Sequence, residues 1–180
     1  LSILSYSINT EKYIKLSYEY LESDRSYLSK IKSRIGRYYY QVGNAENGKQ
    51  ETLDAMKISC EGESNEYIDV LIDCVETFYT YKEYEIADEM IDKALNLSIC
   101  SEDTSLIERA YYLKGMILQR QGLYRQAETY MNISTDYFLK SANDEDTYKR
   151  YTEMAELYYN IGEPREAIKY FTLAMNLEKN

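Results

Sequence analysis

Apolar residues recur at steps of three and four along most of the chain, a spacing that predicts amphipathic α-helices. Polar clusters interrupt this pattern at 23–26, 62–65, 101–104 and 143–147. These clusters are rich in Ser, Asp, Asn and Thr, the residues that cap helix N-termini, so each one predicts the start of a helix. The clusters follow one another at steps of about 40 residues, which indicates a repeated unit.

Three segments of the chain align without gaps on this period. Each segment is anchored by an alanine, and the alanines lie 40 residues apart at Ala87, Ala127 and Ala167. A large apolar residue follows four positions later, and a small one three positions after that: Ile91 and Ala94, Met131 and Ser134, Phe171 and Ala174. We therefore expect these three alanines to be buried where two helices pack closely.

A second helix precedes each alanine, and one of its faces carries a bulky residue, a small residue and another bulky residue. The three copies of this face are Leu71, Cys74, Val75 and Phe78; Tyr111, Gly115 and Leu118; Tyr151, Met154, Ala155 and Tyr158. A weaker fourth copy follows Gly36, and there Gly48 replaces the usual alanine. The unit is therefore a pair of helices joined by a turn.

This arrangement resembles the tetratricopeptide repeat, which has a bulky–small–bulky first helix, a Gly-x-Tyr turn and an alanine in the second helix. The resemblance implies an all-α fold, a right-handed superhelical solenoid of helix-turn-helix repeats with a period of about 40 residues, longer than the usual period of about 34. We expect one domain over 1–180. Its parts are a truncated half-repeat at 1–24 and helix pairs at 27–62, 66–100, 104–141 and 146–180.

Composition excludes several classes of function. The formal net charge of −10 argues against direct nucleic-acid contact by this segment, which would neutralise phosphates with basic residues. With no His in the chain and no phosphate-cradling Gly-rich loop, we expect no enzyme, no cofactor and no metal site. Three cysteines without CxxC spacing, and no signal peptide or membrane-spanning run, favour a reducing, cytoplasmic setting without membrane contact.

The resemblance also implies a binding surface, because the first helices of such repeats line a concave groove. The positions that would face this groove are Lys30, Arg34, Arg37, Tyr40 and Gln41; Asp69, Ile72, Asp73, Glu76 and Tyr79; Arg109, Tyr112, Met116, Gln119 and Arg120; Lys149, Thr152, Glu153, Glu156, Tyr159 and Asn160. Such a polar, aromatic surface of both signs suits an extended peptide. The alternative is that Lys30, Arg34 and Arg37 only pair with Asp69, Asp73 and Glu76 on the next first helix.

Two functions from different classes agree with this pattern. Lengthened, Tyr-rich repeats resemble the C-terminal region of the peptide-pheromone receptors of Gram-positive bacteria, in which a short signalling peptide enters the groove, often of a dimer, and alters DNA binding. That resemblance implies a peptide-binding sensor of a bacterial transcriptional regulator, a homodimer, and a DNA-binding domain upstream of Leu1. The alternative is a general scaffold that binds another folded protein and no small ligand. Chaperone-tail docking is disfavoured, because Ile72, Glu76 and Tyr112 do not supply its Lys/Asn clamp.

Overall fold

The computed structural model describes residues 12–19, 24–62, 64–140 and 144–177, and these residues contain helices and turns but no strand. Residues 12–19 of the predicted half-repeat at 1–24 are helical. Residues 1–11 and 20–23 of that half-repeat lie outside the described part of the chain. The helices that follow are α2 (Arg25–Gln41), α3 (Ala45–Ser59), α4 (Asn65–Thr80), α5 (Tyr84–Ser101), α6 (Thr104–Arg120), α7 (Tyr124–Phe138), α8 (Asp144–Ile161) and α9 (Pro164–Leu177).

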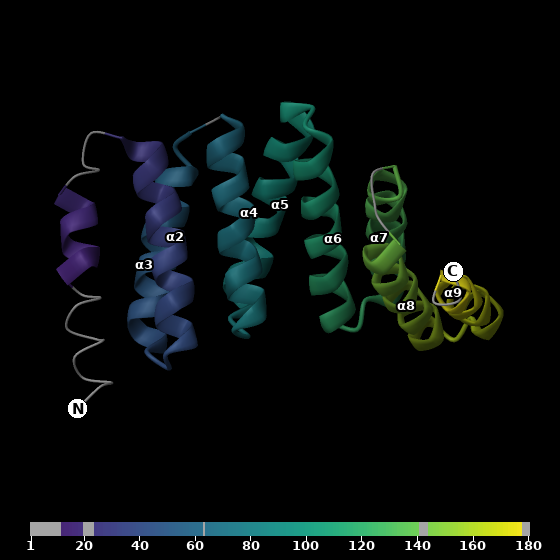
Figure 1. Cartoon of the computed structure of the whole chain (residues 1–180). Coiled ribbons are helices and arrows are strands. Elements are labelled where there is room, and N and C mark those ends of the chain that lie inside the picture. Colours follow the sequence, from purple (N-terminus) through teal and green to yellow (C-terminus); the bar gives the residue numbers. More distant parts are fainter. Residues whose placement is uncertain (1–11, 20–23, 63, 141–143, 178–180) are drawn as a thin grey trace. The chain divides into compact units, whose positions relative to one another are not determined.

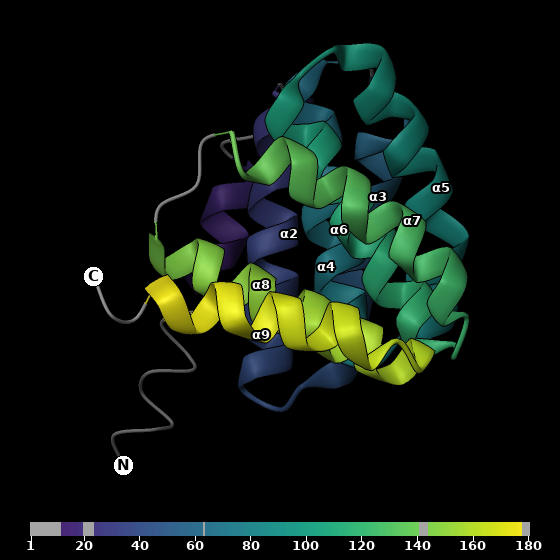
Figure 2. The same ribbon diagram turned by 90° about the vertical axis from the view of Figure 1, so that its right-hand side faces the viewer.

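The chain forms two compact units, Leu1–Glu83 and Tyr84–Asn180. In the first unit α2 packs along α3, and α4 packs against both of them. In the second unit α6 pairs with α7 and α8 pairs with α9, while α5 packs on α6 and α7 packs on α8. Figure 2 shows the last pair plainly, with α9 lying alongside α8. The all-α helix-pair fold predicted from the sequence is confirmed.

Side chains at the helix starts explain several of the boundaries. The Asp24 carboxylate accepts a hydrogen bond from the backbone N–H of Tyr27 at the start of α2. Asp103 accepts from the backbone N–H groups of Ser105 and Leu106 at the start of α6. Each carboxylate satisfies an N–H group that has no partner within its helix.

The turn inside each helix pair is made by one residue with a positive φ angle. Glycine fills this position at Gly43, Gly122 and Gly162, with φ of 82°, 78° and 87°, and Lys82 fills it at 68°. Glycine adopts this left-handed conformation without the steric cost that a Cβ brings. The Gly-x-Tyr turn of the sequence pattern therefore has a backbone cause.

The three anchoring alanines are buried as expected, with exposed fractions of 0% at Ala87, 0% at Ala127 and 3% at Ala167. In the second unit, Ala127 belongs to an apolar cluster that joins the last two helix pairs. The cluster consists of Leu118, Ala127, Met131, Met154, Leu157, Tyr158 and Ala167. This core holds α6, α7, α8 and α9 together and fixes the first helices α6 and α8 that carry candidate binding residues.

Candidate functional site

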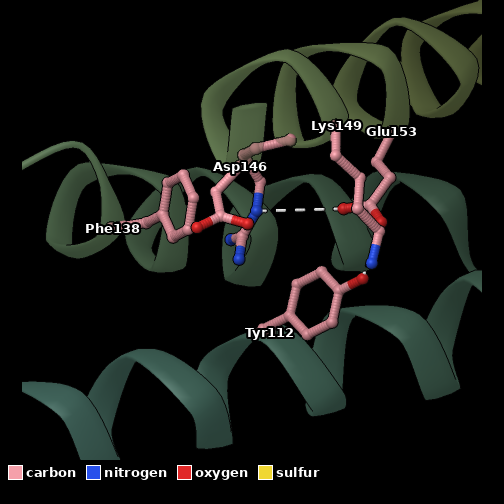
Figure 3. A pocket seen from close by; sticks show the side chains of 6 residues that line it. Tyr112, Phe138, Asp146, Lys149 and Glu153 are labelled. Carbon is pink, nitrogen blue, oxygen red and sulfur yellow. Dashed lines mark hydrogen bonds and ion pairs between the residues drawn. The ribbon is translucent and has the colours of Figure 1, made fainter. Parts of the chain in front are cut away.

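A small polar pocket lies where α6, the end of α7 and the start of α8 meet (Figure 3). Its volume is about 130 Å³, and it is lined by Tyr112, Phe138, Asp146, Lys149, Arg150 and Glu153. Four of these residues come from α8 at spacings of three and four, which places them on one helical face. The other two are aromatic residues from α6 and from the last turn of α7.

Arg150 anchors this pocket from below the surface, and only 6% of the residue is exposed. Its guanidinium carbon lies 4.3 Å from the ring centroid of Tyr112 and 4.4 Å from that of Phe138. The same group donates hydrogen bonds to Glu108 Oε1 at 2.7 Å and to Ser134 Oγ at 2.6 Å. Arg150 is therefore fully engaged by α6 and α7, and it orders the pocket rather than offering a free cation.

Glu153 is the titratable group that faces the pocket. Its Oε1 accepts a hydrogen bond from the Tyr112 hydroxyl at 2.9 Å, and its Oε2 lies 3.8 Å from Arg150 Nε. Burial raises the pKa of the Glu153 carboxyl, and this effect outweighs the opposing influence of Tyr112 and Arg150. The exposed side chain of Lys149 adds a cation at the rim. The pocket can therefore meet either sign of charge on a ligand.

A larger, open hollow of about 420 Å³ lies farther along α8. It is lined by Glu156, Tyr159 and Asn160, which the sequence placed in the groove, and by Phe171 of α9. Tyr112, Lys149 and Glu153 were also placed in the groove and line the smaller pocket. Within the second unit, the first helices α6 and α8 thus present two depressions bordered by predicted groove residues.

In the first unit, one charged residue behaves as the pairing alternative predicts. Arg37 of α2 donates to Thr77 Oγ1 at 3.3 Å and to the Asp73 carbonyl at 3.5 Å, and it lies 4.0 Å from Glu76. The side chains of Arg37 and Glu76 are 42% and 46% exposed, so this ion pair is weak and solvent-screened. Arg37 therefore links α2 to α4.

Two residues placed in the groove by the repeat register are buried instead. Tyr40 is 8% exposed, and its ring stacks on that of Tyr81 at a centroid distance of 4.4 Å. Tyr40 turns inward because Gly48 leaves room for it: a Cβ built on Gly48 would lie 2.8 Å from the Tyr40 ring. Ile72 is 0% exposed within the apolar surface of α4. Neither side chain is available to a ligand, which corrects the groove assignment at these two positions.

The other predicted groove residues keep at least part of their surface. Those that are exposed are Lys30, Arg34, Gln41, Arg120, Lys149, Glu156, Tyr159 and Asn160. Those that are partly exposed are Arg37, Asp69, Asp73, Glu76, Tyr79, Arg109, Tyr112, Met116, Gln119, Thr152 and Glu153. Their role in binding remains a prediction.

The sequence analysis missed Arg150 and Phe138. A signal for Arg150 was present, because positions 40 and 80 residues earlier hold Ala110 and Val70, both buried. A long cation at a position that is otherwise small and apolar must find a partner inside the protein. Nothing in the spacing marked Phe138.

Cysteines and acidic groups offer no second kind of site in the described part of the chain. No group of three His, Cys, Asp or Glu residues there could hold a metal ion. Burial raises the pKa of the Cys74 thiol to about 12, which makes it a poor nucleophile. Among the described residues no helix is both long enough and apolar enough to cross a bilayer.

No family model matches the sequence, and no curated protein matches it. Solved structures do match. BtubC (BKLC) from P. vanneervenii superposes with a TM-score of 0.81 at 15% identity, over 95% of this chain and 72% of that one. Aspartyl phosphate phosphatase F from Bacillus subtilis superposes with a TM-score of 0.72 at 21% identity, over 96% of this chain and 46% of that one.

A third similar structure is the Rap conjugation gene regulator of plasmid pLS20 in complex with the Phr* peptide. It superposes with a TM-score of 0.66 at 15% identity, over 97% of this chain and 51% of that one. The chain therefore spans about half the length of the phosphatase and of the Rap regulator. At these identities the similarity shows the fold, which is the tetratricopeptide-type helical repeat.

Proposed function

We propose that this chain is a peptide-binding repeat module, and that it serves as the sensor part of a bacterial transcriptional regulator that responds to a short signalling peptide. The observation that carries the proposal is the mixed-charge pocket on α6 and α8. It combines an exposed Lys149, a half-buried Glu153 and the Tyr112 ring, all at predicted groove positions. A similarly folded regulator, that of plasmid pLS20, is described in complex with a peptide, which supports this choice of ligand.

The chemistry of the pocket suits one residue of an extended peptide. Its volume of about 130 Å³ matches a single side chain or a chain end rather than a folded partner. Lys149 can attract a carboxylate, while Asp146 and Glu153 can attract an amine, so a peptide with both charges would bind in one direction. Aromatic rings at Tyr112 and Phe138 hold Arg150 in place and keep the pocket preformed.

The test is a titration of the full chain with a library of linear synthetic peptides of five to ten residues, followed by calorimetry on those that bind. We expect Lys149→Glu to weaken a binding peptide by at least about tenfold, which corresponds to about 1.4 kcal/mol. Lys57→Glu is the matched control, because Lys57 is an equally exposed lysine on α3. If no peptide binds, or if both charge reversals weaken binding equally, the proposal is wrong.

A scaffold that binds a folded protein is the second candidate, and the exposed apolar residues of α9 favour it. Ile168, Phe171 and Met175 are 65%, 41% and 56% exposed. Apolar surface of this kind commonly marks a protein contact. The two candidates differ in their ligands: the scaffold would bind a folded partner and give no peptide signal at Lys149.

A further inference from the structure

One side of α9 carries an apolar stripe that no helix covers in the described part of the chain (Figure 2). The stripe consists of Ile168, Phe171 and Met175, which lie three and four residues apart and therefore share one helical face. Phe171 also borders the open hollow of about 420 Å³ beside Tyr159 of α8. The stripe thus adjoins a depression that can receive side chains.

The repeat itself shows what happens at the equivalent positions, which lie 40 residues earlier. Met131 and Thr135 of α7 correspond to Phe171 and Met175, and they are 0% and 4% exposed. Met131 is buried in the apolar cluster that includes Met154 and Tyr158 of α8, the first helix of the next pair. At this register position, the covering element is a first helix that presents bulky apolar side chains.

The outer face of α9 lacks the polar character of a solvent-facing end. Ile168 stands where the two preceding pairs have Asp88 and Glu128, so this face is more apolar than its inner equivalents. A terminal repeat that meets water normally has a polar outer surface, which keeps the array soluble. The substitution pattern is that of a face that meets another protein element.

A charge at the edge of the stripe specifies the occupant further. Arg125 of α7 pairs with Glu163 at 2.7 Å, and Glu163 lies in the turn that follows α8. Arg165 is the equivalent of Arg125 in α9 and is exposed. An element that docks as α8 docks on α7 would bring the residue after its C-terminus close to Arg165.

We propose that the outer face of α8 and α9 docks an amphipathic helix of a protein partner. This helix packs bulky apolar side chains on Ile168, Phe171 and Met175, and a carboxylate just after its C-terminus pairs with Arg165. The inference is independent of the peptide pocket, because none of the residues that line that pocket belongs to this stripe. It gives a chemical description of the partner that the scaffold candidate requires.

The first probe is a fluorescein-labelled peptide with the sequence of residues 141–163, which contains α8 and the turn glutamate. We expect its anisotropy to rise saturably with the full chain. Phe171→Glu should weaken binding at least about tenfold, because it places a charge in an apolar contact. Arg165→Glu should weaken it less and remove most of its salt dependence. Ile99→Glu is the control, an exposed isoleucine of α5 outside the stripe.

A second measurement covers the case in which the free peptide is too weakly helical to bind. Residues 141–163 are appended directly after Asn180, which keeps the 40-residue register. We expect hydrogen exchange in α9 to slow at least about tenfold relative to a fusion whose appended copy carries glutamates at the positions of Met154 and Tyr158. Equal exchange in the two fusions, together with no peptide binding, would overturn the proposal.

A second copy of this chain is the competing occupant, and light scattering on a sizing column distinguishes it. We expect the free chain to be a monomer at micromolar concentration. A dimer that Phe171→Glu converts to monomer would show that the face pairs with itself, and the helix-docking proposal would then be wrong. A dimer that persists in the variant would use another surface, and the peptide and exchange results would then decide.

Discussion

The guanidinium of Arg150 lies 2.7 Å from the carboxylate of Glu108, and both side chains are largely buried, with 7% and 16% exposed. The hydroxyl of Ser134 completes the contact, donating to Glu108 at 3.0 Å while accepting from Arg150. The positions 40 residues earlier hold Ala110 and Ile68. An ion pair thus replaces an apolar contact in the last two helix pairs.

Removing one partner of this buried pair should destabilise the fold strongly. We expect Arg150→Met to lower the free energy of unfolding by about 3–5 kcal/mol, because Glu108 is left buried without its cation. The double variant Arg150→Met with Glu108→Leu should recover most of that loss, since it restores the apolar chemistry of the preceding pair. Urea denaturation followed by circular dichroism measures both. A loss near zero in the single variant would mean that the pair is no stronger than a surface ion pair.

The turn at Lys82 offers a stabilising substitution. Lys82 has φ of 68° at the position where the other helix pairs have glycine. We expect Lys82→Gly to raise the free energy of unfolding by about 0.5–1 kcal/mol, because glycine removes the cost of the left-handed conformation. The converse variant Gly122→Ala should cost about 1–2 kcal/mol. A Cβ at Gly122 meets no atom within 4 Å, so that loss would report backbone strain alone.

Sequence periodicity was sufficient to predict the helix pairs and the buried alanines, because small residues at a fixed step leave few other ways to pack helices. It was insufficient for side-chain direction. Tyr40 has the register of a groove residue, yet its ring fills the space beside Gly48, where the other pairs have alanine. The direction of a side chain depends on the volume of its neighbours, and periodicity does not carry that information.

The pocket is harder to predict for a related reason. Arg150 and Phe138 are 12 residues apart and lie on different helices, and the loop between those helices sets their meeting. A charged residue at an apolar register position signals that some partner exists. It does not say that the partners are Glu108, Ser134 and two aromatic rings, which come from α6 and α7.

Protonation of Glu153 should make stability depend on pH. Burial raises the pKa of this carboxyl in the folded state, so the folded chain binds the proton more tightly than the unfolded chain. Stability contributed by this group therefore rises as the pH falls from neutral through the raised pKa, and it levels off below the unfolded value of about 4.3. We expect Glu153→Gln to be more stable than the parent at pH 7 and to lose this rise.

Thermal unfolding of both proteins across pH 4 to 8 measures this effect. Glu156→Gln is the control, because Glu156 lies one helical turn away on α8 and is exposed. If Glu153→Gln is less stable than the parent at pH 7, the ionised carboxylate stabilises the fold. The cost of its burial would then be outweighed by Arg150 and Tyr112, contrary to the raised pKa.

The hydroxyl of Tyr40 should be dispensable for folding. Among the described residues it is the one buried side-chain polar atom without a hydrogen-bond partner. Burial and the nearby Glu83 carboxylate raise the Tyr40 pKa to about 12, so the phenol stays neutral. An unpaired buried polar group costs about 1–3 kcal/mol. We therefore expect Tyr40→Phe to keep or raise the free energy of unfolding, whereas Tyr40→Ala should lower it by about 3–5 kcal/mol because the ring packing is lost.

Tyr158→Phe is the matched control for Tyr40→Phe. Tyr158 is buried to a similar degree, with 7% exposed, but its hydroxyl accepts a hydrogen bond from Asn132 at 3.3 Å. Removing that hydroxyl leaves the Asn132 amide without this partner, so we expect a loss of about 0.5–1.5 kcal/mol. Urea denaturation of the two Phe variants compares them directly. Equal losses in both would show that the Tyr40 hydroxyl has a partner in solution, and that water reaches the space between Tyr40 and Tyr81.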